Sequence, residues 1–291
     1  MAKRETAKVA NANLLSGDKL YLVRARKVLP YLVRQAKAGQ PIYYSDLANE
    51  IGIPNPRNLN YILGSIGNGL LQLIKRTKSD IPPIQCLVIN KRDELPGEGV
   101  GWFISKTDFA KLNKTQRKKI VDAQLARIYT FHYWDWVLEE LNLQPIEVDL
   151  KDEIEKAKGF VGGGESEQHR QLKEFIAKNP TLLGLNNTIG EGLIEYPLPS
   201  ADRVDILFKE KGLKIGVEVK SLLSNTADIL RGLFQCVKYK YLIEAEQTIN
   251  NMVPNSRVIL ALEGELPSDL TLIKNLLGVE VVQRIQTGNK K

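Results

Sequence analysis

The chain has 291 residues, enough for two domains, because a single hydrophobic core rarely grows beyond about 250 residues. An apolar share of 43% and a charged share of 26% exclude wholesale disorder. The longest apolar runs, such as residues 258–262, are far shorter than the ~20 residues of a membrane-spanning helix, and no apolar export segment follows the basic N-terminus. Two cysteines cannot form a disulfide framework or a four-cysteine zinc site, so we expect a cytoplasmic protein with no membrane partner.

Positive charge is concentrated in the first half of the chain. Residues 1–130 contain 22 Lys and Arg against 10 Asp and Glu, residues 131–164 contain 3 against 8, and residues 165–291 contain 16 of each. A basic half joined to a neutral half predicts a polyanion-binding module, with DNA as the expected partner, attached to a domain with another task. The alternative is that these lysines only solvate helices.

The first elements are expected to be helical. Residues 1–18 have no periodicity and are expected to be a flexible arm, whereas apolar residues recur at helical spacing from Lys19 until the stop at residues 39–41. A short β-type run at residues 41–44 precedes a second helix capped by Ser45. After a tight turn at residues 52–56, a third helix has one apolar stripe, made of Leu59, Ile62, Leu63, Ile66, Leu70 and Leu73.

Two short helices joined by a glycine-containing turn predict a helix-turn-helix. Two β-type runs follow, Ile84 to Ile89 and Gly101 to Ile104, and they predict a hairpin. We therefore expect a winged helix-turn-helix DNA-binding domain over residues 19–105. The alternative is a generic small α+β domain.

The same segment resembles the DNA-binding domain of the DNA-repair alkyltransferases and alkyltransferase-like proteins. The resemblance lies in "PIYYSDLANEIGIPNPRNLNYILGSI", "IPPIQCLVIN" and "GEGVGWF", and it implies a third helix that enters a DNA groove. The reactive cysteine of that family lies in a Pro-Cys-His-Arg-Val motif. Here Cys86 is followed by Leu87 and lacks the activating histidine, so we expect Cys86 to be a buried core residue without alkyl-transfer activity.

Several residues of this domain are candidate DNA contacts. The N-terminal half of a recognition helix supplies base-edge and phosphate contacts, and basic residues of a wing neutralise phosphates. The candidates on or near the third helix are Arg57, Asn58, Asn60, Tyr61 and Ser65, and those of the wing are Lys91 and Arg92. The alternative for each one is an ordinary polar surface residue.

Residues 106–164 are expected to connect two domains. Residues 106–142 are expected to be helical, with an aromatic cluster at residues 129–136 that packs against the first domain. An acidic stretch and the glycine-rich hinge at residues 159–164 follow. The second domain is then expected to span residues 165–291.

Two predicted strands of the second domain carry the candidate chemistry. In the run from Leu213 to Lys220, alternation places Glu218 and Lys220 on the face opposite three apolar residues. Asp205 lies in an apolar run on the preceding strand. Two carboxylates on adjacent strands repel each other unless a divalent cation lies between them. The alternative is a Glu218–Lys220 ion pair across the sheet, with Asp205 a surface acid.

The spacing of these residues resembles the motif of the PD-(D/E)XK nuclease superfamily. Asp205 is followed, after twelve residues, by Glu218, Val219 and Lys220. A later helix containing Gln235 and Tyr239 resembles the Gln-x-x-x-Tyr motif of its RecB-like branch. The resemblance implies a restriction-endonuclease-like α/β sheet flanked by helices. It also implies Mg²⁺, with Mn²⁺ as a possible substitute, held by Asp205, Glu218 and the Val219 carbonyl, and Lys220 assisting the attacking water.

Other residues receive roles from the same resemblance. Gln235 and Tyr239 are expected to fix the phosphate or the lysine, and Arg203 to contact the scissile strand. The site also needs an upstream acid on the preceding helix. Glu167 is the first choice and Glu165 the second, and His169 lies in the same first turn.

The sequence therefore predicts a metal-dependent DNA endonuclease of restriction, anti-phage defence or DNA repair. It is expected to have two domains of the α+β and α/β classes. A homodimer is expected, because such nucleases often cut two strands with two sites. The alternative is a DNA-binding regulatory protein whose nuclease-like domain is catalytically inactive.

Overall fold

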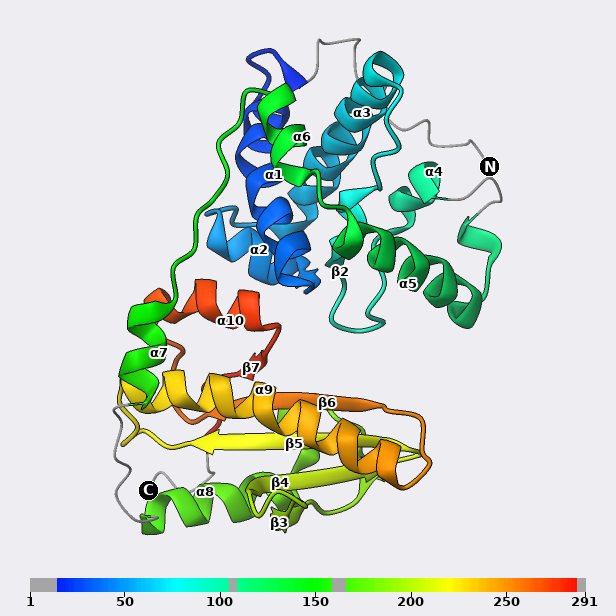
Figure 1. The fold of residues 1–291 in the computed structure, drawn as a ribbon. Coiled ribbons are helices and arrows are strands. Elements are labelled where there is room, and N and C mark those ends of the chain that lie inside the picture. The colour runs from blue at the N-terminus through cyan, green and yellow to red at the C-terminus, as the bar shows by residue number, and fades with distance from the viewer. Residues whose placement is uncertain (1–14, 105–108, 159–165, 287–291) are drawn as a thin grey trace. The chain divides into compact units, whose positions relative to one another are not determined.

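The computed structural model describes residues 15–104, 109–158 and 166–286 (Figure 1). The chain divides into two compact units, residues 1–148 and residues 149–291. Each unit combines helices with β-strands. The glycine-rich hinge expected at residues 159–164 lies outside the described residues, as do residues 1–14 of the expected arm.

The first unit begins with the helices that the sequence predicts. Helix α1 (Leu20–Ala38) ends at Gly39, whose φ of 65° is the left-handed conformation that glycine adopts most easily. Helix α2 (Tyr44–Glu50) and helix α3 (Leu59–Thr77) follow, separated by a turn and a short 3₁₀ segment (Pro56–Asn58). The predicted cap at Ser45 is wrong, because α2 begins at Tyr44 and Ser45 lies inside its first turn. The apolar stripe of α3 packs against α1 in the core of the unit.

The end of the expected arm is fixed rather than flexible. The side chain of Leu15 is buried in the core of the first unit, directly beside Gly69. The Arg26 guanidinium donates hydrogen bonds to the carbonyls of Leu15 and Gly17. Residues 15–18 therefore belong to the folded unit.

The expected hairpin is wrong. Residues Ile84–Leu87 form a 3₁₀ turn, and strand β2 (Val88–Ile89) pairs in parallel with strand β1 (Ile42–Tyr43). Residues Gly101–Ile104 form the short helix α4. All four residues of the 3₁₀ turn are buried, which a strand facing solvent on one side does not allow. The described part of this segment thus contains no two-stranded wing.

One helix was expected over residues 106–142, but the described part of this range, residues 109–142, contains two α-helices. Helix α5 (Lys114–Thr130) begins with a capping box, in which Asn113 and Gln116 exchange hydrogen bonds between side chain and backbone. Helix α6 (Trp134–Glu140) follows after three residues. Trp134 is buried and lies edge-on to Phe131 at 4.8 Å between ring centroids. Packing within the first unit is confirmed for Tyr129, Phe131, Trp134 and Trp136, whereas Tyr133 is exposed.

The second unit is built on one five-stranded sheet. Its strands are β3 (Leu193–Pro197), β4 (Arg203–Glu210), β5 (Leu213–Lys220), β6 (Ser256–Leu262) and β7 (Glu280–Val282), in that order across the sheet. The pairs β3–β4 and β4–β5 are antiparallel, whereas β5–β6 and β6–β7 are parallel. Parallel pairs need crossover connections, and helices α9 (Thr226–Ile249) and α10 (Thr271–Leu277) lie in them.

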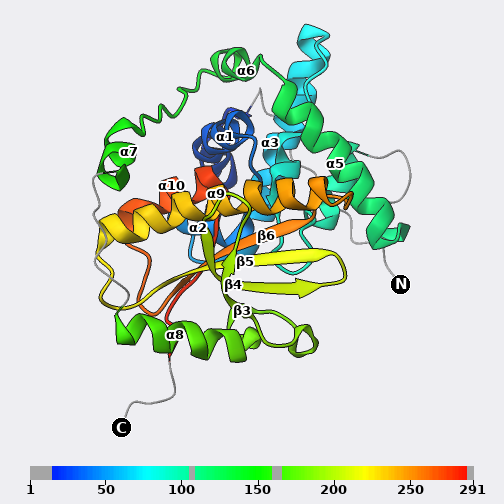
Figure 2. The same ribbon diagram turned by 60° about the horizontal axis from the view of Figure 1, so that its bottom comes forward.

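Helices cover both faces of this sheet (Figures 1 and 2). Helix α8 (Glu167–Lys178) packs on the face of β5 that carries Ile215, Val217 and Val219. Helix α9 packs on the opposite face, where Gly216 and Glu218 lie. Helix α7 (Lys151–Lys158) belongs to this unit and packs against α9. The alternation predicted for β5 is therefore confirmed.

None of the helices in residues 15–104, 109–158 and 166–286 is both long enough and apolar enough to span a membrane.

Candidate active site

Asp205 lies where strands β4 and β5 separate. The ladder between the two strands ends at the pair Ile206–Val217. Asp205 is the residue before Ile206 on β4, and its side chain takes the place of a backbone acceptor. Its Oδ2 accepts a hydrogen bond of 2.8 Å from the amide of Val219. The carboxylate therefore lies at the seam between the strands, where groups from both faces of the sheet can approach it.

Glu218 and Lys220 lie side by side on the α9 face. Both are buried, with exposed fractions of 4% and 7%. The Lys220 Nζ lies 3.0 Å from Oε1 of Glu218 and 2.8 Å from Oδ1 of Asp228, in the first turn of α9. Asn225 caps this turn by accepting a hydrogen bond from the Asp228 amide. The ammonium is thus held between two carboxylates.

The electrostatics of this pair are unusual for a buried site. Burial, followed by the negative charge of Asp205, raises the pKa of Glu218 to about 7, although Lys220 opposes the shift. For Lys220, burial alone lowers the pKa, but the charges of Glu218 and Asp228 outweigh it and raise the pKa above its usual value. The ionised form of Glu218 is therefore disfavoured in the metal-free site, and an added cation would stabilise it.

A close approach of α9 to β5 confines the lysine. A Cβ atom at Gly232 would lie 2.9 Å from Cε of Lys220 and 3.0 Å from Cδ1 of Leu260. A side chain at this position would push against the aliphatic stem of Lys220. The helix therefore fixes the position of the ammonium as well as supplying Asp228.

Helix α8 brings two nitrogen groups to Asp205 from the other face. Nε2 of His169 lies 3.8 Å from Oδ2 of Asp205, and Nζ of Lys173 lies 3.8 Å from Oδ1. The Lys173 ammonium also forms a close ion pair with Glu195 of β3. The Asp205 carboxylate raises the pKa of His169, and burial opposes this shift. Both oxygens of Asp205 therefore face positive or ionisable groups.

Gln235 and Tyr239 lie on the α9 side of the site. Nε2 of Gln235 donates to the Tyr239 hydroxyl at 3.3 Å. Burial, with smaller effects from the charges of Glu218 and Asp205, raises the pKa of Tyr239 far above its usual value. Oε1 of Gln235 is buried without a hydrogen-bond partner in the described structure. An unsatisfied buried acceptor of this kind is suited to a donor from a bound ligand or water.

Some expected site residues do not reach this cluster. Glu167 is exposed, and its carboxylate accepts hydrogen bonds from Arg170 and Gln171, so the first choice for the upstream acid is not supported. Arg203 is exposed at the beginning of β4. Glu165 lies outside the described residues. Val219 contacts Asp205 through its amide, whereas its carbonyl as a metal ligand stays a prediction.

Three residues of the cluster were missed from the sequence, namely Lys173, Glu195 and Asp228. Lys173 is four residues after His169 and next to the apolar Leu172, so helical spacing places it on the inner side of α8. Asp228 stands three residues after Asn225, at the start of a helix. Glu195 lies in the β3 run without any such signal, because its position depends on a left-handed φ of 51° inside a strand.

The charges of the cluster fit a single divalent cation. The cluster contains two ammonium groups, of Lys173 and Lys220, and four carboxyl groups, of Asp205, Glu218, Asp228 and Glu195. When all four carboxyl groups are ionised and His169 is neutral, the cluster lacks two positive charges. Mg²⁺ is usually held by one or two carboxylates and completes its shell with water and phosphate oxygens. Asp205 and Glu218 supply this donor set. No group of three or more metal-binding side chains occurs within the described ranges.

The candidate DNA contacts of the first unit lie on an exposed edge. Arg57, Asn58 and Asn60 are exposed, and Tyr61 is 68% exposed. Ser65 is not available for a contact, because it is buried and its hydroxyl donates to the Tyr61 carbonyl. In the loop after β2, Arg92 is exposed, while Lys91 lies 3.7 Å from Asp46 and over the ring of Tyr43.

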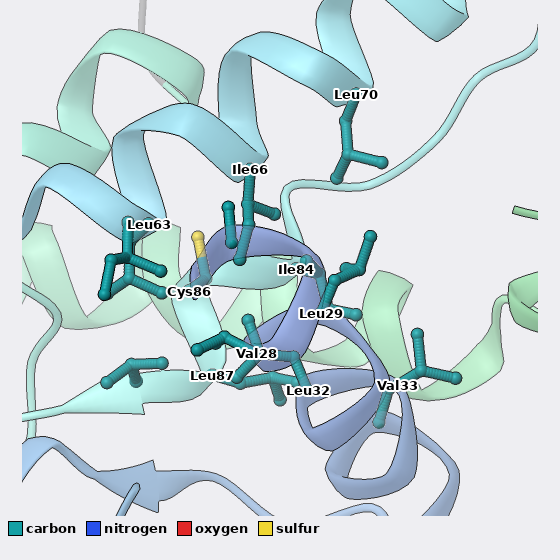
Figure 3. Close-up of a cluster of buried hydrophobic side chains, with 14 of the residues drawn as sticks. Val28, Leu29, Leu32, Val33, Leu63, Ile66, Leu70, Ile84, Cys86 and Leu87 are labelled. Atoms are coloured by element: carbon teal, nitrogen blue, oxygen red, sulfur yellow. The ribbon is translucent and has the colours of Figure 1, made fainter. Parts of the chain in front are cut away.

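Cys86 is buried, as the sequence predicts. Figure 3 shows its sulfur among apolar side chains, including those of Leu63 and Ile66 of α3. Burial raises the pKa of the thiol far above its usual value, so Cys86 is a poor nucleophile near neutral pH.

Comparison of the chain with protein-family models, with curated proteins and with solved structures finds no match. The function is therefore inferred from the residues and the geometry of the chain itself.

Proposed function

We propose that the second unit is the catalytic domain of a DNA endonuclease that requires a divalent metal ion, as the resemblance to the PD-(D/E)XK superfamily implies. The observation that carries this proposal is the buried Glu218 beside Asp205, with its raised pKa and its contact to Lys220. A protein stabilises such a carboxylate with difficulty unless a cation binds to it. A bound Mg²⁺ would activate water and stabilise the charge that develops on the phosphodiester.

The side chains of the unit would each have a part in this reaction. Asp205 and Glu218 hold the cation, and the protonated Lys220 donates a hydrogen bond to the phosphate or to the attacking water. Asp228 positions Lys220, since the two groups are 2.8 Å apart. Oε1 of Gln235 accepts a hydrogen bond from a bound water or ligand.

We further propose that the first unit binds DNA through the start of α3 and the loop after β2. Residues 1–148 contain 22 basic and 14 acidic residues, whereas residues 149–291 contain 19 and 20. The exposed Arg57, Asn58 and Tyr61 support a contact at the start of a recognition helix. In this proposal the first unit is a winged helix, and the loop with Lys91 and Arg92 takes the place of a hairpin wing.

A plasmid-cleavage assay tests the catalytic proposal. With Mg²⁺, the full-length protein is expected to convert supercoiled plasmid to nicked or linear DNA, and EDTA is expected to stop the reaction. Glu218→Gln and Lys220→Met should each lower the rate at least about 100-fold, because each removes a group at the reacting phosphate.

Two matched variants control for the loss of charge alone. Glu265→Gln removes an exposed carboxylate of the same unit, and Lys211→Met removes an exposed ammonium from the β4–β5 turn. Both should cleave at the wild-type rate. If the four variants all cleave equally, the assignment of Glu218 and Lys220 is wrong.

A second candidate function is DNA binding without catalysis. It is favoured by the contacts of Asp205, whose oxygens already face the Val219 amide, His169 and Lys173. Under this alternative, the protein binds DNA tightly but cleaves neither duplex nor single strands with Mg²⁺ or Mn²⁺.

A further inference from the structure

Lys173 is a buried cation at the centre of the α8 face. Only 2% of the residue is exposed, and burial of an ammonium is costly unless carboxylates lie beside it. Its Nζ forms a close ion pair with Glu195 and lies 3.8 Å from Oδ1 of Asp205. One ammonium therefore lies against two carboxylates from neighbouring strands.

The backbone around Glu195 is shaped to make this contact. The β3–β4 ladder pairs Ile194 with Ile206 and Tyr196 with Val204, but it omits the pair of Glu195 and Asp205. Glu195 has a φ of 51°, which a residue with a side chain rarely adopts within a strand. Such a conformation is unfavourable and is retained where the surrounding structure enforces it.

Asp205 thus has a fixed cation on one side and the proposed metal position on the other. Its second oxygen accepts from the Val219 amide, and its charge acts on Glu218. In nucleases with two metal ions, the ions lie about 3.5–4 Å apart and clamp the attacking and leaving oxygens. Asp205 is similar to a carboxylate of such a site, because it also lies between two positively charged positions, the Lys173 ammonium and the proposed metal ion.

We propose that the Lys173 ammonium takes the place of a second metal ion, so that the site binds a single divalent cation between Asp205 and Glu218. The inference rests on the proposed nuclease function and specifies its metal content. Lys173 is a positioning residue, because it orients Asp205 and balances the charge of Glu195 without touching the substrate. With both lysines in place, all four carboxyl groups ionised and His169 neutral, the cluster lacks two positive charges, which one divalent ion supplies.

The number of Mn²⁺ ions bound per chain tests the proposal. Metal-free, full-length protein is titrated with Mn²⁺, and the free Mn²⁺ is measured by electron paramagnetic resonance. The wild type is expected to bind one ion per chain. Lys173→Met keeps the apolar stem but removes the charge, and it should bind two ions. Lys178→Met, which removes an exposed lysine from the same helix, should bind one.

Glu195→Gln provides a second test that leaves Lys173 in place. Without Glu195, the ammonium loses its close ion-pair partner, interacts more strongly with Asp205 and competes with the metal for that carboxylate. The variant should still bind one Mn²⁺, with an affinity about tenfold weaker, equivalent to ~1.4 kcal/mol. An unchanged affinity would contradict the proposal even if Lys173→Met fails to fold.

The outcomes separate this inference from the proposed function. Two ions on the wild type, or one ion on folded Lys173→Met, would overturn the role of Lys173 while leaving a metal-dependent nuclease intact. If wild-type binding is absent, or survives Glu218→Gln unchanged, the proposed metal site itself is wrong.

Discussion

At the scale of single residues, Glu218 determines the chemistry of the candidate site. Its pKa is raised to about 7, first by burial and then by the charge of Asp205. The folded state therefore binds a proton at Glu218 more tightly than the unfolded chain does. The contribution of this group to stability accordingly falls as the pH rises from the unfolded pKa, near 4.3, through about 7.

We expect Glu218→Gln to stabilise the metal-free protein at pH 8 by about 1–3 kcal/mol, because the amide removes a buried charge. At pH 5 the carboxyl group is already protonated in the folded state, so the two proteins should unfold at nearly the same temperature. Thermal unfolding without metal at both pH values checks this. An equal or lower stability of the variant at pH 8 would show that Lys220 fully compensates the charge.

The two thiols give a second test at the residue scale. Burial raises the pKa of both Cys86 and Cys236, so neither forms a thiolate near neutral pH. Fewer than one thiol per chain should react with a thiol-specific disulfide reagent at pH 8, and both should react in denaturant. Rapid modification of Cys86 in the folded protein would instead favour a reactive cysteine in the first unit.

At the scale of elements, α9 serves the site through its closeness to β5. A methyl group at Gly232 would meet the Lys220 side chain, whereas alanine in place of a helical glycine stabilises a helix by about 1 kcal/mol. We therefore expect Gly232→Ala to remain folded but to cleave at least about tenfold more slowly, because Lys220 is displaced. Cleavage rate and unfolding temperature are measured together.

A glycine in another helix provides the matched control for this prediction. Gly64 lies in α3, and an added Cβ there would meet no atom within 4 Å. Gly64→Ala should preserve the cleavage rate. If Gly232→Ala also preserves it, the close approach of α9 has no role in positioning Lys220.

The elements of the second unit that carry the candidate site, α8, β4, β5 and α9, could be predicted from the sequence. In β5, charged and apolar residues alternate, and this pattern specifies both the strand and the face of Glu218. The segment Ile84–Leu87 could not be predicted, because a short apolar run suits a strand and a buried 3₁₀ turn equally. The same ambiguity affected residues 101–104, which form a short helix.

The surroundings of Asp205 also escaped prediction. An acid was expected on the first helix of the second unit, but the side chains that face Asp205 from α8 are His169 and Lys173. Glu167 is two residues before His169, about 200° around the helix, and it faces solvent. Sequence spacing gives the faces of a helix but not which face packs on the sheet.

At the scale of the whole molecule, two units divide the proposed tasks of binding and cleavage. We expect Arg57→Ala to weaken DNA binding and to reduce the slope of log K against log salt concentration by about 1, because one phosphate contact is lost. Lys75→Ala, at the far end of α3, should leave the slope unchanged. Binding isotherms at several salt concentrations give both values.

A substitution in one unit should affect only the task proposed for that unit. Glu218→Gln should bind DNA without metal as tightly as the wild type, whereas Arg57→Ala should bind Mn²⁺ normally. A loss of metal binding on Arg57→Ala would contradict the division of tasks between the two units.

A crystal structure of the full chain grown with Mn²⁺ provides the decisive measurement, because anomalous scattering locates the ion without assumptions about its ligands. We predict one strong anomalous peak, within about 2.0–2.5 Å of a carboxylate oxygen of both Asp205 and Glu218, with Lys173 still between Asp205 and Glu195. A map with no peak at this position, or with a peak that only one of the two carboxylates contacts, would contradict the metal-dependent nuclease.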